Sequence, residues 1–223
     1  MRGAGLNLLG LARGPIILAS ASPRRRELLE RMEVPLEVVP ANVPENNRRA
    51  EESPEQYVRR LAREKGDAVA DQLAGARGYV VLAADTIVEI DGEVLEKPTD
   101  TVEADRFLAR MGGRWHRVWT GLYLRRLKEP DDARPLSASG AEMSRVFFST
   151  LDPGARRQYI STGEPMDKAG GYGIQGFGGM FVPRIEGDYF NVMGLPLARL
   201  RALCHELEGH ADPSAGDCGE RIE

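Results

Sequence analysis

Asp85 is the residue whose position in the sequence most favours a catalytic or metal-binding role. It follows the apolar run 79–84, which Gly78 precedes, and such a run predicts a strand that is buried on both faces. A buried strand has no low-energy place for an unpaired charge, and ligands of α/β proteins bind at the carboxyl ends of strands. We therefore expect this strand to end on Asp85, with the carboxylate serving as a metal ligand or a general base. The alternative is a loop aspartate that caps a turn.

A phosphate site is predicted at residues 20–26, where Ser-Ala-Ser-Pro-Arg-Arg-Arg separates a strand from a helix. The N-terminus of a helix presents free N–H groups and the positive end of the helix dipole, which suit an anion. The side-chain donors at this point are Ser20, Ser22, Arg24 and Arg25. Arginines in a first turn oppose the helix dipole, so a helix without a ligand would tend to avoid them. The alternative is a capped helix whose basic first turn is solvated.

The chain contains 26 Arg but only 4 Lys, so each lysine is a candidate for a position that needs a compact ammonium. Lys65 falls on the apolar stripe of a predicted helix, where it needs an anionic partner or must extend its ammonium to solvent. Lys97 follows a hairpin predicted by Asp91 and Gly92, which would return the chain toward Asp85. An ammonium there would neutralise charge that develops in phosphoryl transfer. An exposed loop lysine is the alternative.

Residues 167–176 combine glycines with polar side chains. Four glycines fall within 170–176, and glycine lets the backbone approach a ligand closely. The amide of Gln175 offers one acceptor and two donors, which suit the edge of a nucleobase. A bulged strand would explain the glycines equally well, but it would not readily explain Asp167, Lys168 and Gln175 among them.

The elements that position these residues alternate along the chain. Strands are predicted at 16–19, 35–40, 79–84, 87–90, 115–127 and 143–148, with a loop at 134–140 and a β-hairpin at 181–191. Helices are predicted to start at Ser22, Ser53, Asp100, Asp152 and Pro196. Strands that interleave with helices and hairpins predict a mixed α/β sheet rather than a purely parallel one.

Composition limits the class of protein. The 223 residues, 42% of them hydrophobic, suffice for one large domain or two small ones. No run approaches the roughly 20 apolar residues of a membrane span, and a net charge of −4 argues against nucleic-acid binding. Cys204 and Cys218 form no disulfide framework, which predicts a reducing, cytoplasmic location. With His205 and His210 they lack the spacing of a zinc site, and His116 is interpreted as structural.

Seven segments together resemble the Maf family of nucleotide pyrophosphatases. They occur in family order and are 18–25, 61–65, 84–86, 96–98, 116–120, 167–176 and 191–196. The resemblance implies an α/β fold similar to that of inosine triphosphate pyrophosphatases and Ham1, with an elongated mixed sheet, flanking helices and a central cleft between two lobes. It also implies metal-dependent hydrolysis of a nucleoside triphosphate to the monophosphate and pyrophosphate, with Mg²⁺ or Mn²⁺ as the divalent cofactor.

The resemblance assigns roles to individual residues. Asp85 is similar to the residue that activates water and binds the metal, and Glu45 is similar to the second acidic metal ligand. Lys65 and Lys97 match catalytic positions that also hold the triphosphate. The positions that match substrate-binding residues are Ser20, Ser22, Arg24, Arg25, Thr86, Lys168 and Gln175. Residues 42–44 read Asn-Val-Pro where the family is usually richer in Asp.

The segment 167–176 is similar to that of the subtype that acts on dTTP and UTP. Arg24, Thr86 and Gln175 match the specificity positions of that subtype. One alternative is the subtype that acts on 7-methyl-GTP, against which Gln175 argues. The other is a nucleotide-binding regulator of septum formation that needs no turnover.

Domain organisation and partners follow from the extent of the resemblance. Residues 1–14 are expected to form an N-terminal extension, 15–208 a single catalytic domain of two lobes, and 209–223 a disordered tail. The partner that the resemblance implies is a nucleoside triphosphate substrate, with neither nucleic acid nor a membrane. A homodimer is implied by the resemblance alone.

Overall fold

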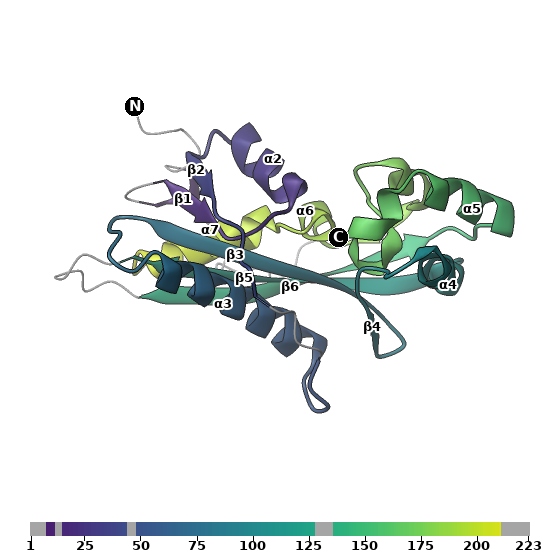
Figure 1. Cartoon of the computed structure of the whole chain (residues 1–223), viewed down its shortest axis with the longest axis horizontal. Coiled ribbons are helices and arrows are strands. Elements are labelled where there is room, and N and C mark those ends of the chain that lie inside the picture. The colour runs from purple at the N-terminus through teal and green to yellow at the C-terminus, as the bar shows by residue number, and fades with distance from the viewer. Residues whose placement is uncertain (1–7, 12–14, 44–47, 128–135, 211–223) are drawn as a thin grey trace, which may run out of the picture.

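The computed structural model describes residues 8–11, 15–43, 48–127 and 136–210 (Figure 1). Its strands are β1 (Ile16–Leu18), β2 (Leu36–Val38), β3 (Val80–Ile90), β4 (Glu93–Leu95), β5 (Arg114–Arg126), β6 (Ser137–Phe148) and β7 (Arg184–Glu186). They form a seven-stranded sheet of order β2-β1-β3-β5-β6-β7, and β4 pairs with β3. β1 pairs in parallel with β2 and β3, and the other pairs are antiparallel. The predicted mixed α/β sheet is confirmed.

Helices cover both faces of this sheet. The helices are α2 (Pro23–Arg31), α3 (Pro54–Gln72), α4 (Thr101–Met111), α5 (Pro153–Ser161), α6 (Tyr189–Met193) and α7 (Leu197–Leu207). On β3, Ile87 packs with Leu61 of α3, whereas Leu82 belongs to a cluster with Leu200 of α7. Side chains of a strand alternate between its two faces, so α3 and α7 lie on opposite sides. Among the described residues, no helix is both long and apolar enough to cross a membrane.

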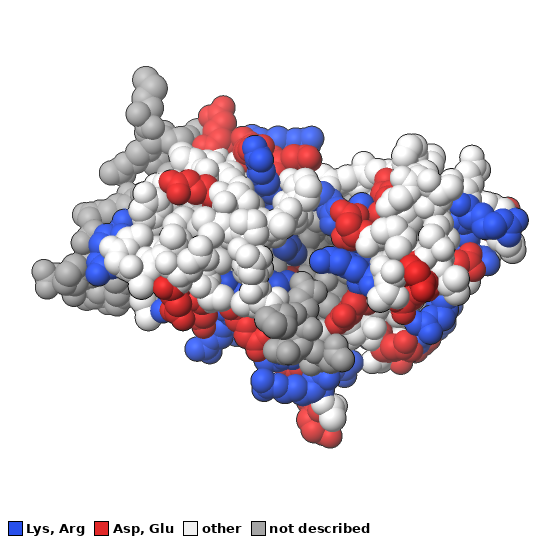
Figure 2. All heavy atoms as spheres, in the orientation of Figure 1, with Lys and Arg blue, Asp and Glu red and all other residues white. Residues whose placement is uncertain are grey.

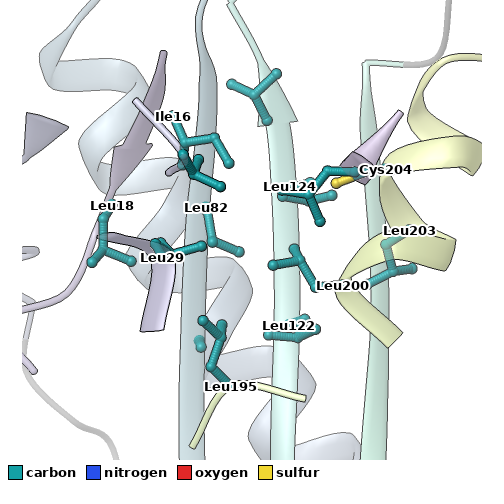
Figure 3. Packing of buried hydrophobic residues seen from close by; sticks show 14 of the residues in the cluster. Ile16, Leu18, Leu29, Leu82, Leu122, Leu124, Leu195, Leu200, Leu203 and Cys204 are labelled. Carbon is teal, nitrogen blue, oxygen red and sulfur yellow. The ribbon is translucent and has the colours of Figure 1, made fainter. Parts of the chain in front are cut away.

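Two apolar clusters lie along the length of β3 and β5. The proximal cluster joins β1, α2 and α7 to the first half of β3, and Figure 3 shows Leu200 and Leu203 of α7 beside Leu122 and Leu124 of β5. The distal cluster joins α4 and α5 to the second half of β3; its members include Val88, Ile90, Phe107, Leu108, Phe148 and Tyr172. The long central strands therefore carry one sheet through both clusters.

His116 lies buried at the distal cluster, in agreement with its structural interpretation. Its Nε2 lies 2.8 Å from the Tyr172 hydroxyl, and its ring meets that of Tyr172 edge to face. Burial lowers the pKa of His116 to about 3. The imidazole is therefore neutral throughout the physiological range of pH.

Helix α3 packs unusually close to the sheet because each partner contributes a glycine. Gly66 of α3 lies over the ring of Tyr123, and Gly121 of β5 lies under the backbone of Val58. A Cβ atom at either glycine would overlap its neighbour. The two missing side chains therefore set the distance between α3 and the sheet.

Local signals predicted most element starts correctly. The Ser53 side chain accepts a hydrogen bond from Gln56 N–H, and the Gln56 side chain accepts one from Ser53 N–H, which completes a capping box. Asp91 and Gly92 join β3 to β4 with φ angles of 55° and 79°, as a two-residue hairpin turn requires.

Three predictions of strand limits are wrong. The break predicted between strands 79–84 and 87–90 does not exist: β3 runs through Asp85 to Ile90, because it pairs with β5 without interruption over 80–89. The loop predicted at 134–140 is partly strand, since β6 begins at Ser137.

The third error is the hairpin predicted at 181–191. β7 pairs with β6 rather than with the chain that follows it. Asp188 then accepts a hydrogen bond from Phe190 N–H and starts helix α6, so a helix cap stands where a hairpin turn was expected.

Leu9 and Leu11, from the predicted N-terminal extension, are buried in the proximal cluster.

Candidate active site

A cavity of about 370 Å³ opens where β3 loses its strand neighbour on one edge. β1 pairs with β3 up to Leu82, and β4 pairs with it only from Val88, so in the described chain no strand covers the edge between them. The cavity walls include segments 19–25, 96–97 and 167–175. In Figure 2 this face is hollowed between the α2 side and the α5 side, with basic side chains at the hollow.

Asp85 and Lys65 form an ion pair on the cavity wall. The Lys65 Nζ atom lies 2.5 Å from Asp85 Oδ1, and the two side chains are only 13% and 10% exposed. The pair forms because α3 lies directly over β3, and Asp85 points to the α3 face of that strand. Lys65 therefore has the anionic partner that its inward position requires, and it does not extend to solvent.

Arg25 lies on the other face of β3 and donates four hydrogen bonds to protein acceptors. They go to Gly194 O at 2.8 Å, Ser20 Oγ at 3.0 Å, Ala84 O at 2.9 Å and Thr86 Oγ1 at 3.0 Å. Ala84 lies on the uncovered edge of β3, so the guanidinium occupies the place of a neighbouring strand. The substrate-binding role predicted for Arg25 stays a prediction, and its observed contacts brace the cavity wall.

A chain of hydrogen bonds continues from Arg25 into the sheet. Thr86 and Thr120 share a hydrogen bond of 3.0 Å, and the Thr120 hydroxyl donates to Asn191 O at 3.0 Å. The Asn191 amide then donates to Ser144 Oγ at 3.0 Å. These polar groups lie between the proximal and distal clusters, and they fix α6 to the sheet beside the cavity.

Two further predicted residues, Ser22 and Arg24, lie at the start of α2. Ser22 is the N-cap residue of α2, but its side chain makes no capping hydrogen bond. The Arg24 guanidinium lies 3.6 Å from the carboxylate of Asp167, across the cavity, in a half-exposed ion pair. Both residues line the cavity.

The remaining basic residues differ in their partners. Within the described chain, Lys97 lines the cavity and makes no hydrogen bond or ion pair. Lys168 also lines it, but its ammonium donates to Glu164 O at 2.8 Å and to Asp167 Oδ1 at 2.5 Å. Lys97 is therefore the lysine whose charge is available to a ligand.

Glu96 is a cavity residue that the sequence did not single out. Its carboxylate accepts a hydrogen bond of 2.6 Å from the hydroxyl of Tyr57, a buried residue of α3. Burial and the neighbouring Glu96 raise the pKa of Tyr57, so the hydroxyl stays protonated and remains a donor. Glu96 could have been suspected only from its position beside Lys97.

The donor set on the cavity wall fits a magnesium ion that binds together with a phosphate ligand. The described residues contain no group of three or more His, Cys, Asp and Glu side chains that could enclose a metal. Asp85 and Glu96 nevertheless both line the cavity. Mg²⁺ is commonly held by one or two carboxylates together with substrate phosphates. Glu45, the second predicted metal ligand, lies outside the described residues.

Gln175 lines the cavity from the glycine-rich segment, which is not a bulged strand. One short 3-10 turn, η2 (Ala169–Gly171), lies within the segment, while η1 (Glu164–Asp167) ends at its first residue and η3 (Phe177–Phe181) follows it. Gly170 and Gly171 have φ angles of 69° and 73°, a conformation that favours glycine. Residues 173–178, here called the 173–178 loop, follow η2 and end in the first turn of η3, and they carry Gln175 to the cavity.

Comparisons with known proteins find relatives of this chain along most of its length. A family model described as Maf-like protein matches residues 15–207. A Vibrio cholerae protein named dTTP/UTP pyrophosphatase is 47% identical over 86% of this chain and 97% of its own length. A Thermus thermophilus protein of the same name is 43% identical over 87% of this chain and 96% of its own. The solved structure of the Staphylococcus aureus Ham1 protein matches 61% of this chain and 72% of its own, at 14% identity and a TM-score of 0.40.

Proposed function

This chain belongs to the Maf family, and we propose that it hydrolyses dTTP and UTP to the nucleoside monophosphate and pyrophosphate. The relatives named dTTP/UTP pyrophosphatase, which match it along most of its length, support a hydrolase of phosphoanhydride bonds. The single observation that carries the proposal is the Asp85–Lys65 pair on the wall of a cavity that is also lined by Lys97, which makes no hydrogen bond or ion pair with any residue that the structure describes. A carboxylate, a fixed ammonium and a free ammonium are the groups that phosphoanhydride hydrolysis needs.

The nucleotide is proposed to span the cavity. Its phosphates lie toward Ser20, Ser22 and Lys97, where hydroxyl and ammonium donors are directed at an anion. Its base lies toward Gln175, whose amide can pair with the carbonyl and N–H groups of a pyrimidine edge. This orientation puts the phosphates beside Asp85.

Asp85 is proposed as the general base. Its carboxylate, held against the Lys65 ammonium, accepts a proton from the attacking water. The resulting hydroxide attacks the α-phosphorus, and the bond to the β-phosphate oxygen breaks. Lys97 stabilises the negative charge that develops on the departing pyrophosphate. A divalent ion held by Asp85, Glu96 and Glu45 would supply further neutralisation of the phosphate charge.

The test is pyrophosphate release from a panel of nucleoside triphosphates with Mg²⁺ or Mn²⁺ present. The wild type is expected to prefer dTTP and UTP, and Asp85→Asn to lower kcat by about 10² to 10⁴-fold, the typical contribution of a general base. Asp91→Asn, in the exposed β3–β4 turn, is the matched control and is expected to keep full activity. Preference for 7-methyl-GTP would overturn the substrate assignment, and an active Asp85→Asn would overturn the role of the base.

A further inference from the structure

Glu164 lies outside the cavity, and its carboxylate holds the loop that carries Gln175. Glu164 Oε2 accepts a hydrogen bond of 2.9 Å from Phe177 N–H, and Oε1 accepts one of 3.0 Å from Gly178 N–H. Oε1 also accepts a hydrogen bond of 2.8 Å from the hydroxyl of Tyr159. One carboxylate therefore fixes the end of the 173–178 loop.

Tyr159 extends this contact to the start of the same loop. Its hydroxyl accepts a hydrogen bond of 3.2 Å from Gly173 N–H while it donates to Glu164. Tyr159 is buried in the distal cluster, on helix α5, so its hydroxyl cannot exchange these partners for bulk water. Both ends of the loop are thus joined to the half-buried Glu164 and the buried Tyr159, which are themselves hydrogen-bonded to each other.

The loop wraps around Glu164 without spare volume. A Cβ atom at Gly176 would overlap the carboxylate of Glu164, and one at Gly178 would lie 2.6 Å from the Tyr159 hydroxyl oxygen. A carboxylate therefore fills the centre of the loop, where an apolar side chain would otherwise pack. Removal of this side chain would leave the N–H groups of Phe177 and Gly178 without this acceptor, and the loss costs more at Gly178, whose hydrogen bond is partly buried, than at the exposed Phe177.

The charge of Glu164 strengthens this arrangement. Burial alone would raise the pKa of Glu164, but hydrogen bonds from Gly178 N–H, the Tyr159 hydroxyl and Phe177 N–H outweigh it and hold the pKa below its ordinary value. The acceptor is therefore an ionised carboxylate at neutral pH. Hydrogen bonds to ionised acceptors are roughly twice as strong as neutral ones.

We infer that Glu164, with Tyr159, is a positioning residue that sets base specificity by fixing where the Gln175 amide lies. Gln175 lines the cavity, whereas neither Glu164 nor Tyr159 is among its lining residues. Their effect on the substrate therefore passes through the 173–178 loop. This inference rests on the proposed function, because it assumes that Gln175 contacts the base.

The experiment compares Glu164→Gln and Tyr159→Phe with Gln175→Ala. Glu164→Gln keeps the shape but replaces one acceptor oxygen by a donor, so we expect KM for dTTP and UTP to rise about tenfold, since small displacements of a binding group have effects of this order. The preference for pyrimidine over purine nucleotides should fall in parallel, with kcat nearly unchanged, as for loss of uniform binding. Tyr159→Phe should shift the same quantities less, and it tests the inference if Glu164→Gln does not fold.

Hydrogen exchange supplies a readout that does not depend on activity. Amide protons of residues 173–178 are expected to exchange faster in Glu164→Gln than in the wild type, while those of α3 stay unchanged. The matched control is Asp152→Asn, which alters a carboxylate that also accepts two backbone N–H groups but lies at the start of α5. It is expected to leave KM and base preference unchanged.

The outcomes distinguish failure of the positioning role of Glu164 from failure of the proposed function. Faster exchange in the loop with unchanged KM and base preference would overturn the positioning role and leave Glu164 purely structural. An equal fall of kcat for every nucleotide would also overturn it. If the wild type prefers 7-methyl-GTP, the proposed function fails, and the positioning role stands only if Glu164→Gln raises KM for that nucleotide as Gln175→Ala does.

Discussion

The two ends of the cavity are built in different ways. At the end proposed to hold the phosphates, here called the phosphate end, regular elements hold the central ion pair: α3 carries Lys65 and β3 carries Asp85, while Ser22 is the N-cap residue of α2. At the base end, Gln175 lies on a loop between 3-10 turns whose backbone groups are bound by the side chains of Glu164 and Tyr159. A helix satisfies its backbone internally and a strand pairs with its neighbours, whereas this loop depends on two side chains, one of them an ionised carboxylate.

This difference indicates which end of the site can be substituted without disturbing the function of the other end. Groups on helices and strands are held more precisely than groups on loops, and two of the groups proposed to act on the reacting phosphate, Lys65 and Asp85, lie on such elements, whereas Lys97 follows the end of β4. Loops tolerate substitution better, and the proposed contact with the base lies there. We therefore expect substitutions at the phosphate end to affect turnover of every nucleotide, and substitutions at the base end to affect the choice among nucleotides.

Lys65→Met is the strongest test of this separation. It should lower kcat by about 10² to 10³-fold for all nucleotides, because it removes charge that is aligned with the reacting groups. It should also cost up to about 3 kcal/mol of stability, since the largely buried Asp85 carboxylate would lose the Lys65 ammonium. The measurements are kcat for several nucleotides and the free energy of unfolding in urea.

A double variant separates the two effects of Lys65→Met. Lys65→Met with Asp85→Asn leaves no unpaired charge, so stability should recover while activity should not. A change of base preference in Lys65→Met, with kcat retained, would contradict the separation between the two ends.

Lowering the pH should reduce the free energy of unfolding through His116, which lies at the distal cluster. Its pKa is about 3 in the folded protein against 6.5 ordinarily, so below pH 6.5 the unfolded chain binds a proton that the folded protein does not. Stability is therefore fully present above pH 6.5 and falls by about 1.4 kcal/mol per pH unit as the pH drops toward 3. His116→Gln cannot titrate and should lack this component. Parallel stability curves for the two proteins between pH 7 and 4 would refute the prediction.

The smallest effect is expected for the ion pair that links the two ends. Arg24 lies 3.6 Å from Asp167 across the cavity, and Asp167 is well exposed. Exposed pairs contribute about 0 to 1 kcal/mol, so Asp167→Asn should change the unfolding free energy by less than about 1 kcal/mol. A larger loss, measured in urea at low and high salt, would mean that the two ends depend on each other.

Much of the phosphate end could be predicted from the sequence because its signals are local. The period of α3 placed Lys65 on the inward face, and the capping box fixed where that helix begins. The strand through Asp85 was predicted to end too early, because the interruption at that point lies in its neighbour β1 and not in β3. The sequence of one strand does not indicate where the neighbouring strands end.

The contacts that brace the site could not be predicted. Arg25 bonds to Gly194, 169 positions away, and Glu164 bonds to the backbone of Phe177, for which no residue-type pattern exists. Gln175 could be recognised in the sequence as a polar residue among glycines. No sequence pattern predicted the contacts that hold the 173–178 loop in shape. The roles of Glu45 and of a second copy of the chain stay predictions from the resemblance.

The close packing of α3 on the sheet matters to anyone who redesigns this protein. Gly66 and Gly121 lie outside the cavity lining, yet a side chain at either would push α3 away and draw Lys65 from Asp85. A mutant library restricted to cavity residues would never sample the two positions that govern this spacing. Directed evolution toward new nucleotides is best served by holding both glycines constant and varying residues 173–178.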